Sequence, residues 1–187
     1  MHGYPLRKVT VGLRQFVQSE TETVNVAQRL KRMDRVVDKL ARFPTMRLSQ
    51  MEDVGGCRAV VQDADEVQRV ARRMRRRWDI VATHDYRDEP KPSGYRALHY
   101  VVRRDGRLIE IQLRTVTQQV WAEAVETWSA RTGFNLKDKE GPVELLEFFR
   151  LAARGIALDE AGEPADEALE REFERLRGRV GRYLVRR

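Results

Sequence analysis

The sequence has a single cysteine and lacks any long apolar run, and both features restrict what the protein can be. Cys57 is the one thiol among 187 residues, which excludes an internal disulfide framework and a cysteine-based zinc site. No hydrophobic stretch approaches the roughly 20 residues that a helix needs to cross a bilayer. The first residues, Met1 to Leu13, lack the apolar core of a signal peptide. We therefore expect a cytoplasmic protein that does not bind membranes.

The common nucleotide and metal motifs are missing as well. The sequence contains no G-x-x-x-x-G-K-[ST] loop, no G-x-G-x-x-G turn and no H-E-x-x-H helix. Nothing in it indicates a nucleophile elbow. Any catalytic or binding site must therefore be formed by residues outside these motifs.

Positive charge is the clearest property of the composition. Lysine and arginine number 36 against 29 acidic residues, which gives a net charge of +7. This excess favours polyanionic partners such as nucleotides, RNA or acidic proteins. The alternative explanation is compositional, because many arginine-rich chains from GC-rich genomes are basic for that reason alone. Within the predicted helix 65–77, a run of arginines could hold an RNA backbone or form a solvated helix end: Arg72, Arg73, Arg75, Arg76 and Arg77.

Apolar periodicity predicts most of the remaining elements. Steps of three and four residues indicate a helix over 24–42, on which Lys31, Arg35 and Lys39 would share one face. Residues 57–62 resemble a buried strand. After Thr115 the pattern is helical again, with an apolar stripe made of Val120, Trp121, Ala124, Val125 and Trp128. Residues 133–141 read as a loop, and two more helices are expected over 143–154 and about 164–184.

The most informative segment is a predicted hairpin. Runs 96–103 and 107–114 are strand-like, and Asp105-Gly106 between them is a favoured type I′ turn. The resulting register places apolar pairs on one side: Leu98 with Leu113, Tyr100 with Ile111, and Val102 with Ile109. The other side carries an imidazole, an amide, a carboxylate and a guanidinium in the pairs His99 with Gln112, Val101 with Glu110, and Ala97 with Arg114. The mixture predicts a functional site, and a solvent-facing strand is the alternative. The order of elements predicts one α+β domain around a mixed or antiparallel sheet flanked by helices.

Four segments carry a resemblance to a known family. They are Arg29-Leu30-Lys31 with Lys39; Asp53 to Arg58, which reads D-x-x-G-x-R; Lys91 to His99, which reads K-P-x-G-Y-x-x-x-H; and Glu110 to Thr115, which reads E-x-Q-x-R-T. As a set they resemble the synthetase domain of the RelA/SpoT family, and the stand-alone small alarmone synthetases in particular. The resemblance implies a nucleotidyltransferase-like fold in a single domain over 1–187, with its core at 25–130 and a helical segment at 142–187.

The resemblance also implies a reaction and a set of roles. The β,γ-pyrophosphate of ATP would pass to the ribose 3′-hydroxyl of GDP or GTP, giving (p)ppGpp and AMP. Such a transfer needs cations around the triphosphate, carboxylates for Mg²⁺ and an oriented hydroxyl. Catalysis is expected from Glu110, Asp53, Gln112 and His99, with Asp53 and Glu110 also holding Mg²⁺. ATP would be bound by Arg29, Lys31, Lys39 and Arg58, and the acceptor by Tyr95, Lys91 and Ser93, with Tyr95 stacked on the base. The alternatives are a capping Asp53, a surface ion pair for Glu110, a solvated basic face and a packing role for Tyr95.

Departures from the family pattern leave the acceptor open. Ser93 replaces a common asparagine, and Ala124-Val125-Glu126 stands where relatives carry an L-E-H-type stretch. These changes fit the toxic branch, whose members pyrophosphorylate the tRNA 3′ end or make adenosine alarmones and are neutralised by an antitoxin protein. A homo-oligomer is also compatible with the resemblance. A catalytically weak RNA- or protein-binding module is the third interpretation, and the intact set of site residues argues against it.

Overall fold

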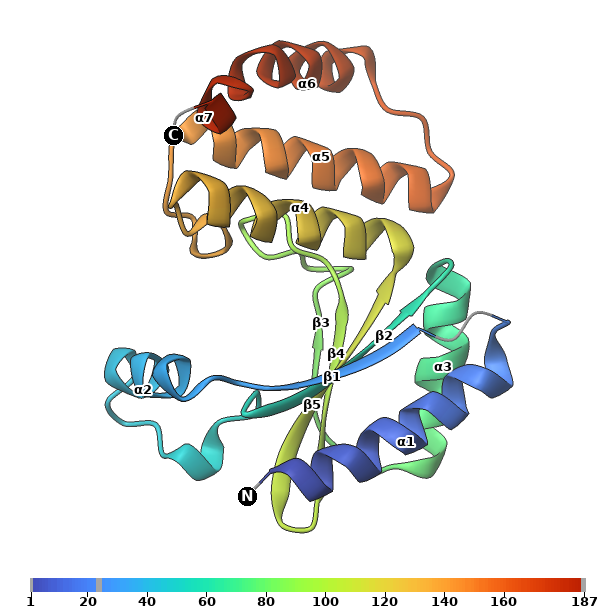
Figure 1. Ribbon diagram of the computed structural model, residues 1–187. Helices are drawn as coiled ribbons and strands as arrows, with labels where there is room; N and C mark the ends of the chain where they lie inside the picture. Colours follow the sequence, from blue (N-terminus) through green and yellow to red (C-terminus); the bar gives the residue numbers. More distant parts are fainter. Residues whose placement is uncertain (1, 23–24, 186–187) are drawn as a thin grey trace. The chain divides into compact units, whose positions relative to one another are not determined.

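The computed structural model describes residues 2–22 and 25–185. The chain forms two compact units, one from Met1–His84 with Ala97–Thr115 and the other from Asp85–Arg96 with Val116–Arg187 (Figure 1). The predicted α+β class with a mixed sheet and flanking helices is confirmed. The single domain over 1–187 stays a prediction. No helix within the described ranges is both long and apolar enough to cross a membrane.

The first unit is built on a five-stranded sheet in the order β1-β2-β5-β4-β3. Its strands are β1 (Asn25–Leu30), β2 (Gly55–Val61), β3 (Ile80–Asp85), β4 (Leu98–Arg104) and β5 (Arg107–Thr115). β1 is antiparallel to β2, β2 is parallel to β5, and β5 is antiparallel to β4. The last strand of the sequence is therefore the central strand of the sheet.

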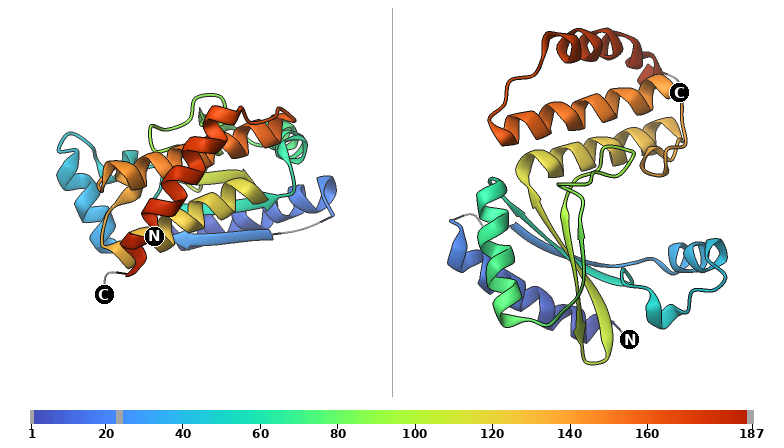
Figure 2. Two further views of the ribbon diagram at one scale, coloured as in Figure 1. Left: turned by 90° about the horizontal axis from the view of Figure 1, so that it is seen from above. Right: turned by 180° about the vertical axis from the view of Figure 1, so that it is seen from behind.

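Two helices, α1 (Gly3–Glu20) and α3 (Ala64–Arg77), cover one face of this sheet (Figure 2). The apolar residues of α1 recur at three- and four-residue steps, so Leu6, Val9, Leu13 and Val17 are all buried. Alternate strand residues point into the same core, among them Tyr100, Ile111 and Leu113. The opposite face of the sheet is left for polar side chains, and we call it the polar face.

The predicted hairpin is confirmed. Asp105 and Gly106 have φ angles of 48° and 73°, and a type I′ turn needs positive φ at both positions. The ladder contains the predicted pairs of 98 with 113, 99 with 112, 100 with 111, 101 with 110 and 102 with 109. Ala97 is outside this ladder, because β4 begins at Leu98.

The prediction of one helix over 24–42 is wrong at its beginning. Residue 24 lies outside the described residues, Asn25–Leu30 is β1, and α2 extends only over Met33–Arg42. β1 lies at the sheet edge with mostly exposed side chains, so its sequence lacks the alternation that identifies a half-buried strand. Lys31 precedes α2 and does not share a helix face with Lys39. The helix α1 and the strand β3 were not predicted at all.

The second unit is helical. It contains α4 (Val116–Thr132), α5 (Val143–Ala161), α6 (Glu167–Val180) and the short α7 (Arg182–Val185), with a 3₁₀ turn at Leu136–Asp138 in the predicted loop. Trp121 is buried as expected, and its indole nitrogen donates to the Phe149 carbonyl at 2.8 Å. Val120 was placed in the same stripe, but it is 59% exposed, which corrects that part of the prediction.

Candidate active site

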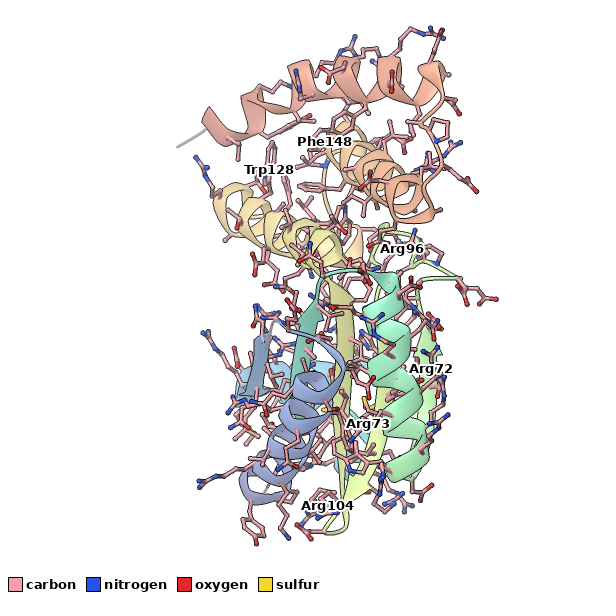
Figure 3. The ribbon with its side chains drawn as sticks, turned by 90° about the vertical axis from the view of Figure 1, so that its right-hand side faces the viewer. Arg72, Arg73, Arg96, Arg104, Trp128 and Phe148 are labelled. Carbon is pink, nitrogen blue, oxygen red and sulfur yellow. The ribbon has the colours of Figure 1, made fainter. Side chains whose placement is uncertain are left out.

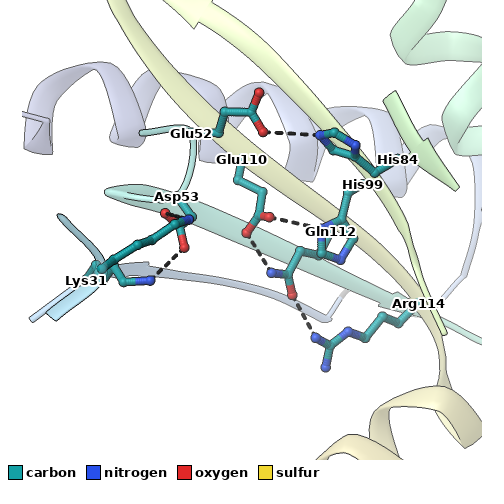
Figure 4. A network of polar contacts seen from close by, with 9 residues as sticks. Lys31, Glu52, Asp53, His84, His99, Glu110, Gln112 and Arg114 are labelled. Atoms are coloured by element: carbon teal, nitrogen blue, oxygen red, sulfur yellow. Dashed lines mark hydrogen bonds and ion pairs between the residues drawn. The ribbon is translucent and has the colours of Figure 1, made fainter. Parts of the chain in front are cut away.

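A chain of hydrogen bonds follows β5 along the polar face (Figure 4). Glu110, Gln112 and Arg114 alternate along the strand and so share this face. His99 Nδ1 lies 2.9 Å from Glu110 Oε1. Gln112 Nε2 donates to Glu110 Oε2 at 2.7 Å, and Arg114 Nη2 donates to Gln112 Oε1 at 2.8 Å. Both oxygens of the Glu110 carboxylate therefore have a partner, and three of the predicted catalytic residues lie together.

This environment decides the ionisation of Glu110. Burial by itself raises the pKa of the carboxyl, but the hydrogen bonds from His99 and Gln112 and the charge of Arg29 outweigh it and lower the pKa from 4.5 to about 2. Glu110 is therefore a carboxylate at neutral pH. A group with so low a pKa is a weak general base, but it accepts hydrogen bonds and binds cations well.

Asp53 forms a second charged group, in the turn that precedes β2. Lys31 Nζ lies 2.6 Å from Asp53 Oδ2, and Lys39 Nζ lies 3.0 Å from Asp53 Oδ1. Burial opposes ionisation of Asp53, but the two lysines outweigh it and hold its pKa below the ordinary value. A backbone hydrogen bond from Lys31 N to the Val54 carbonyl fixes the approach of the first lysine. The carboxylate thus holds two ammonium groups at one point.

The strand register places the two predicted arginines near these groups. Arg29 on β1 is opposite Gly56 on β2, and Gly56 is opposite Glu110. Arg58 on β2 is the partner of Gln112. Because directly paired residues point to the same face of a sheet, Arg29 and Arg58 belong to the polar face. Asp53 precedes Gly56 by three residues, so the lysine group lies at the same end of β2.

The predicted acceptor residues lie in the second unit, in the segment Asp85–Arg96. Lys91 Nζ is 4.4 Å from the centre of the Tyr86 ring and 5.3 Å from that of Tyr95. Tyr95 is 5% exposed and packs edge-on against Tyr86. Tyr95 precedes β4, which begins at Leu98, so the alternation of side chains along that strand does not determine the side of the sheet on which Tyr95 lies.

The backbone conformation and close packing at Gly94 explain why the K-P-S-G-Y segment has a glycine at this position. Its φ is +91°, and an added Cβ would lie 2.8 Å from the Cβ of Ala153 on α5. Only glycine meets both conditions. The Gly94 amide also donates to the Lys91 carbonyl at 2.8 Å, which closes the turn that contains Ser93.

The sequence did not predict the contacts of two groups at the site. Glu52, next to Asp53, is paired with His84 at 3.1 Å between Oε2 and Nε2. His84 lies on β3, a strand that the sequence did not reveal. Arg114 was placed on the polar face but given no role, although the E-x-Q-x-R-T spacing brings it to Gln112.

The residues present have the chemistry that Mg²⁺ requires. Asp53 and Glu110 are both held in the ionised form, and Mg²⁺ prefers oxygen ligands. Within residues 2–22 and 25–185, no cluster of three or more His, Cys, Asp or Glu side chains forms a complete metal cage. Mg²⁺ at nucleotide sites commonly uses one or two carboxylates and takes further ligands from phosphates and water. Each of the two carboxylates therefore has the chemistry of a ligand for a nucleotide-bound ion.

Comparison with known proteins places the chain in a family. Residues 28–131, more than half of the chain, match the region found in RelA/SpoT proteins. The chain belongs to the RelA/SpoT family. This RelA/SpoT chain is 36% identical over 126 residues to the uncharacterised protein Rv1366 of Mycobacterium tuberculosis, a match that covers 64% of the chain and 45% of the relative. It is 29% identical over 126 residues to the GTP pyrophosphokinase YjbM of Bacillus subtilis, covering 61% and 60%.

The RelA/SpoT chain spans about half the length of the curated relatives it matches. Its fold is similar to the crystal structure of small alarmone synthetase 1 from Bacillus subtilis bound to its product pppGpp. The TM-score is 0.67 at 24% identity, and the match covers 95% of this chain and 94% of that one. The expected resemblance to the RelA/SpoT family is thereby confirmed, and the fold is that of a small alarmone synthetase.

Proposed function

We propose that the chain is an ATP-dependent pyrophosphokinase that transfers the β,γ-pyrophosphate of ATP to the ribose 3′-hydroxyl of GDP or GTP. The observation that carries the proposal is the ionised Glu110, held by His99 and Gln112 on the polar face. Membership of the RelA/SpoT family and the similarity to a GTP pyrophosphokinase support the same reaction.

ATP would bind through the basic groups of the first unit. Lys31 and Lys39 already converge on Asp53. A triphosphate carries more negative charge than one carboxylate, so we expect the two ammonium groups to turn toward the phosphates. Arg29 and Arg58 complete the proposed ATP site, because a planar guanidinium can both stack on adenine and bind phosphate. Mg²⁺ held by Asp53 and Glu110 would neutralise charge on the phosphates.

In the transfer itself, the 3′-hydroxyl oxygen attacks the β-phosphorus of ATP. A new P–O bond forms, the bond from the β-phosphorus to the oxygen bridging the α- and β-phosphates breaks, and AMP leaves with the bonding electrons. Phosphoryl-type transfer has a loose transition state that depends on positioning more than on a strong base. We therefore propose that Glu110 orients the hydroxyl by accepting its hydrogen bond. Glu110 would then accept the hydroxyl proton late in the transfer. His99 and Gln112 are positioning residues for that carboxylate.

The acceptor would be bound by Lys91, Ser93 and Tyr95. The Tyr95 ring is 5% exposed, so stacking on a base requires that one face of the ring be uncovered when the acceptor binds. The alternative acceptor is the tRNA 3′ end or an adenosine nucleotide, with an antitoxin protein as partner. The net charge of +7 favours this alternative, because it suits a polyanion.

The test compares acceptors side by side. Purified protein with Mg²⁺ and ATP labelled at the γ-phosphate is incubated with GDP, GTP, ATP or deacylated tRNA, and labelled acceptor and released AMP are measured together. We expect label on GDP or GTP with an equal amount of AMP. Label on tRNA or on an adenosine acceptor alone would support the alternative. No label on any acceptor, under conditions in which YjbM turns over, would refute the proposed reaction.

A further inference from the structure

A surface of arginines lies on the α1 and α3 side of the first unit, away from the polar face. Two hollows adjoin there and share Arg77. One is a groove of about 610 Å³ between α1, the end of α3 and the end of β4. The other, of about 280 Å³, lies between α3 and the end of α1. We call the following exposed residues in their lining the arginine surface: Arg7, Arg72, Arg76, Arg77, Arg103 and Arg104.

The arginine surface is not neutralised by carboxylates. In the part of the chain that the structure describes, none of its members forms an ion pair. The nearby acids are engaged by other bases: Asp105 by Lys8, Glu20 by Arg73, and Glu66 by Arg69. Of the described residues that line the groove, Asp79 alone is acidic. A positive potential therefore persists over this surface.

The arginines of α3 form a line. Positions 69, 72, 73, 76 and 77 recur at three- and four-residue steps, which places them on one side of the helix. Eight residues of helix extend about 12 Å, which is long enough for these arginines to contact successive phosphates of one nucleic-acid strand. Figure 3 shows Arg72 and Arg73 along α3 and Arg104 near the end of the β4–β5 hairpin.

Two arginines repel each other at the end of the β4–β5 hairpin. Arg104 is directly opposite Arg107 in the β4–β5 ladder. Like charges at directly paired positions destabilise a hairpin. A bound anion would relieve this repulsion, whereas a protein that used these arginines only for solubility would gain nothing from pairing them.

Aromatic side chains in the groove indicate which polyanion it suits. Tyr4 is 68% exposed and lines the groove together with Trp78. The Trp78 ring is fixed by Phe16, with ring centres 4.8 Å apart, and by Gly12, where a Cβ would lie 2.6 Å from the indole. A basic groove with aromatic rings is the arrangement that binds single strands, since phosphates contact the cations and unpaired bases stack on the rings. A duplex offers its phosphates but few base faces.

We infer that the arginine surface is a binding site for single-stranded nucleic acid. The backbone follows the arginines of α3, and bases enter the groove toward Tyr4 and Trp78. The site is separate from the candidate active site, because α1 and α3 cover the sheet face opposite Glu110. Its existence does not depend on the proposed reaction.

The test measures binding without ATP. Fluorescence anisotropy follows a labelled mixed-sequence 20-nucleotide RNA, the same sequence as DNA, and its RNA duplex, each over a range of salt concentrations. The test variant is Arg72→Gln/Arg76→Gln/Arg77→Gln. The matched control is Arg171→Gln/Arg175→Gln/Arg177→Gln on α6, which removes the same charge from arginines that are ion-paired with Glu167, Glu172 and Glu174. Circular dichroism checks that both variants are folded.

We expect single strands to bind more tightly than the duplex. The α3 variant should lose about tenfold or more in affinity, and its slope of log K against log salt should fall by about 2, because about 0.7 counterions are released per single-strand phosphate contact. The α6 control should stay within about twofold of the wild type, since its arginines are already neutralised. Tyr4→Ala should weaken single-strand binding and leave duplex binding unchanged.

Three results would overturn the inference. One is absence of measurable single-strand binding by the wild type at low salt. Another is an equal loss in the α3 and α6 variants, which would show that net charge alone is responsible. The third is binding of the duplex as tightly as the single strand. An inactive enzyme that still binds RNA through Arg72, Arg76 and Arg77 would refute the reaction and leave this site intact.

Discussion

The two faces of the sheet in the first unit carry charge in opposite ways. On the polar face, acids and bases meet: Asp53 holds Lys31 and Lys39, and Glu110 contacts His99. On the other side, the six members of the arginine surface form no ion pair among the described residues, because the nearby Glu20 and Glu66 are paired with Arg73 and Arg69. Pairing keeps the carboxylates ionised and the lysines in place until a more highly charged ligand arrives, whereas unpaired cations attract polyanions continuously. The placement of the acids therefore distinguishes a site suited to chemistry from one suited to docking.

Of the variants that test this difference between the two faces, Glu110→Gln should have the largest effect. The change preserves the shape of the side chain but removes the charge with which Glu110 is proposed to orient the hydroxyl and to hold Mg²⁺. We expect the rate of labelled pyrophosphate transfer to fall by at least about 100-fold, with RNA binding unchanged. Exposed Glu163→Gln serves as the control. Turnover within about threefold of the wild type would show that Glu110 has no role in the reaction.

Lys39→Gln should have the next largest effect. It removes one of the two cations that we expect to move from Asp53 to the phosphates. A charge-assisted hydrogen bond contributes about 1.5 to 3 kcal/mol, so KM for ATP should rise about 10- to 100-fold. The control is Lys139→Gln, at an exposed position in the second unit. Equal changes in KM for ATP and for the acceptor would argue against a specific role at the triphosphate.

The pH dependence of stability tests the pairing of Glu110 directly. Its pKa in the folded protein is about 2 against an ordinary 4.5, so it contributes about 3 kcal/mol above pH 4.5. That contribution is lost as the pH falls from 4.5 toward 2. Urea unfolding of the wild type and of Glu110→Gln should therefore give free energies that differ near neutral pH and converge near pH 2. A constant difference across this range would mean that the carboxylate is not held as described.

The smallest effect should come from Arg104→Gln. Removing one of two opposed arginines should stabilise the first unit by about 0.2 to 1 kcal/mol, and the gain should shrink in high salt. Thermal unfolding at low and high salt measures it. Arg103→Gln is the matched control, because Arg103 is opposite the uncharged Leu108. An equal gain from both variants would show that net charge, and not the opposed pair, is responsible.

The sequence predicted the polar face well because its signals are local. Asp105-Gly106 specifies the turn, the turn specifies the register, and the register brings His99, Glu110 and Gln112 together. Each step depends on residues a few positions apart. The same holds for α3, whose acidic start and basic end agree with the helix dipole.

The remainder depended on distant contacts. β1 is a strand because it pairs with β2, and its own periodicity indicated a helix instead. The ion pairs of Asp53 with Lys31 and Lys39 follow from that pairing and from the position of α2, so the sequence named the residues but not their contact. Likewise, the sequence shows the arginines of α3, but the fold determines that Arg72 and Arg76 form no ion pair among the described residues, since the neighbouring acids are paired with Arg69 and Arg73.

The position of β5 in the sheet affects how the protein folds during its synthesis on the ribosome. β5 is synthesised after the other strands, yet it must insert between β2 and β4, which have no direct pairing of their own. Until it emerges, both neighbours present exposed edges, and such long-range closure is slow compared with local folding. A nascent chain that stops short of Glu110 therefore has neither a complete sheet nor the carboxylate proposed for catalysis, and we expect such a fragment to be aggregation-prone and inactive.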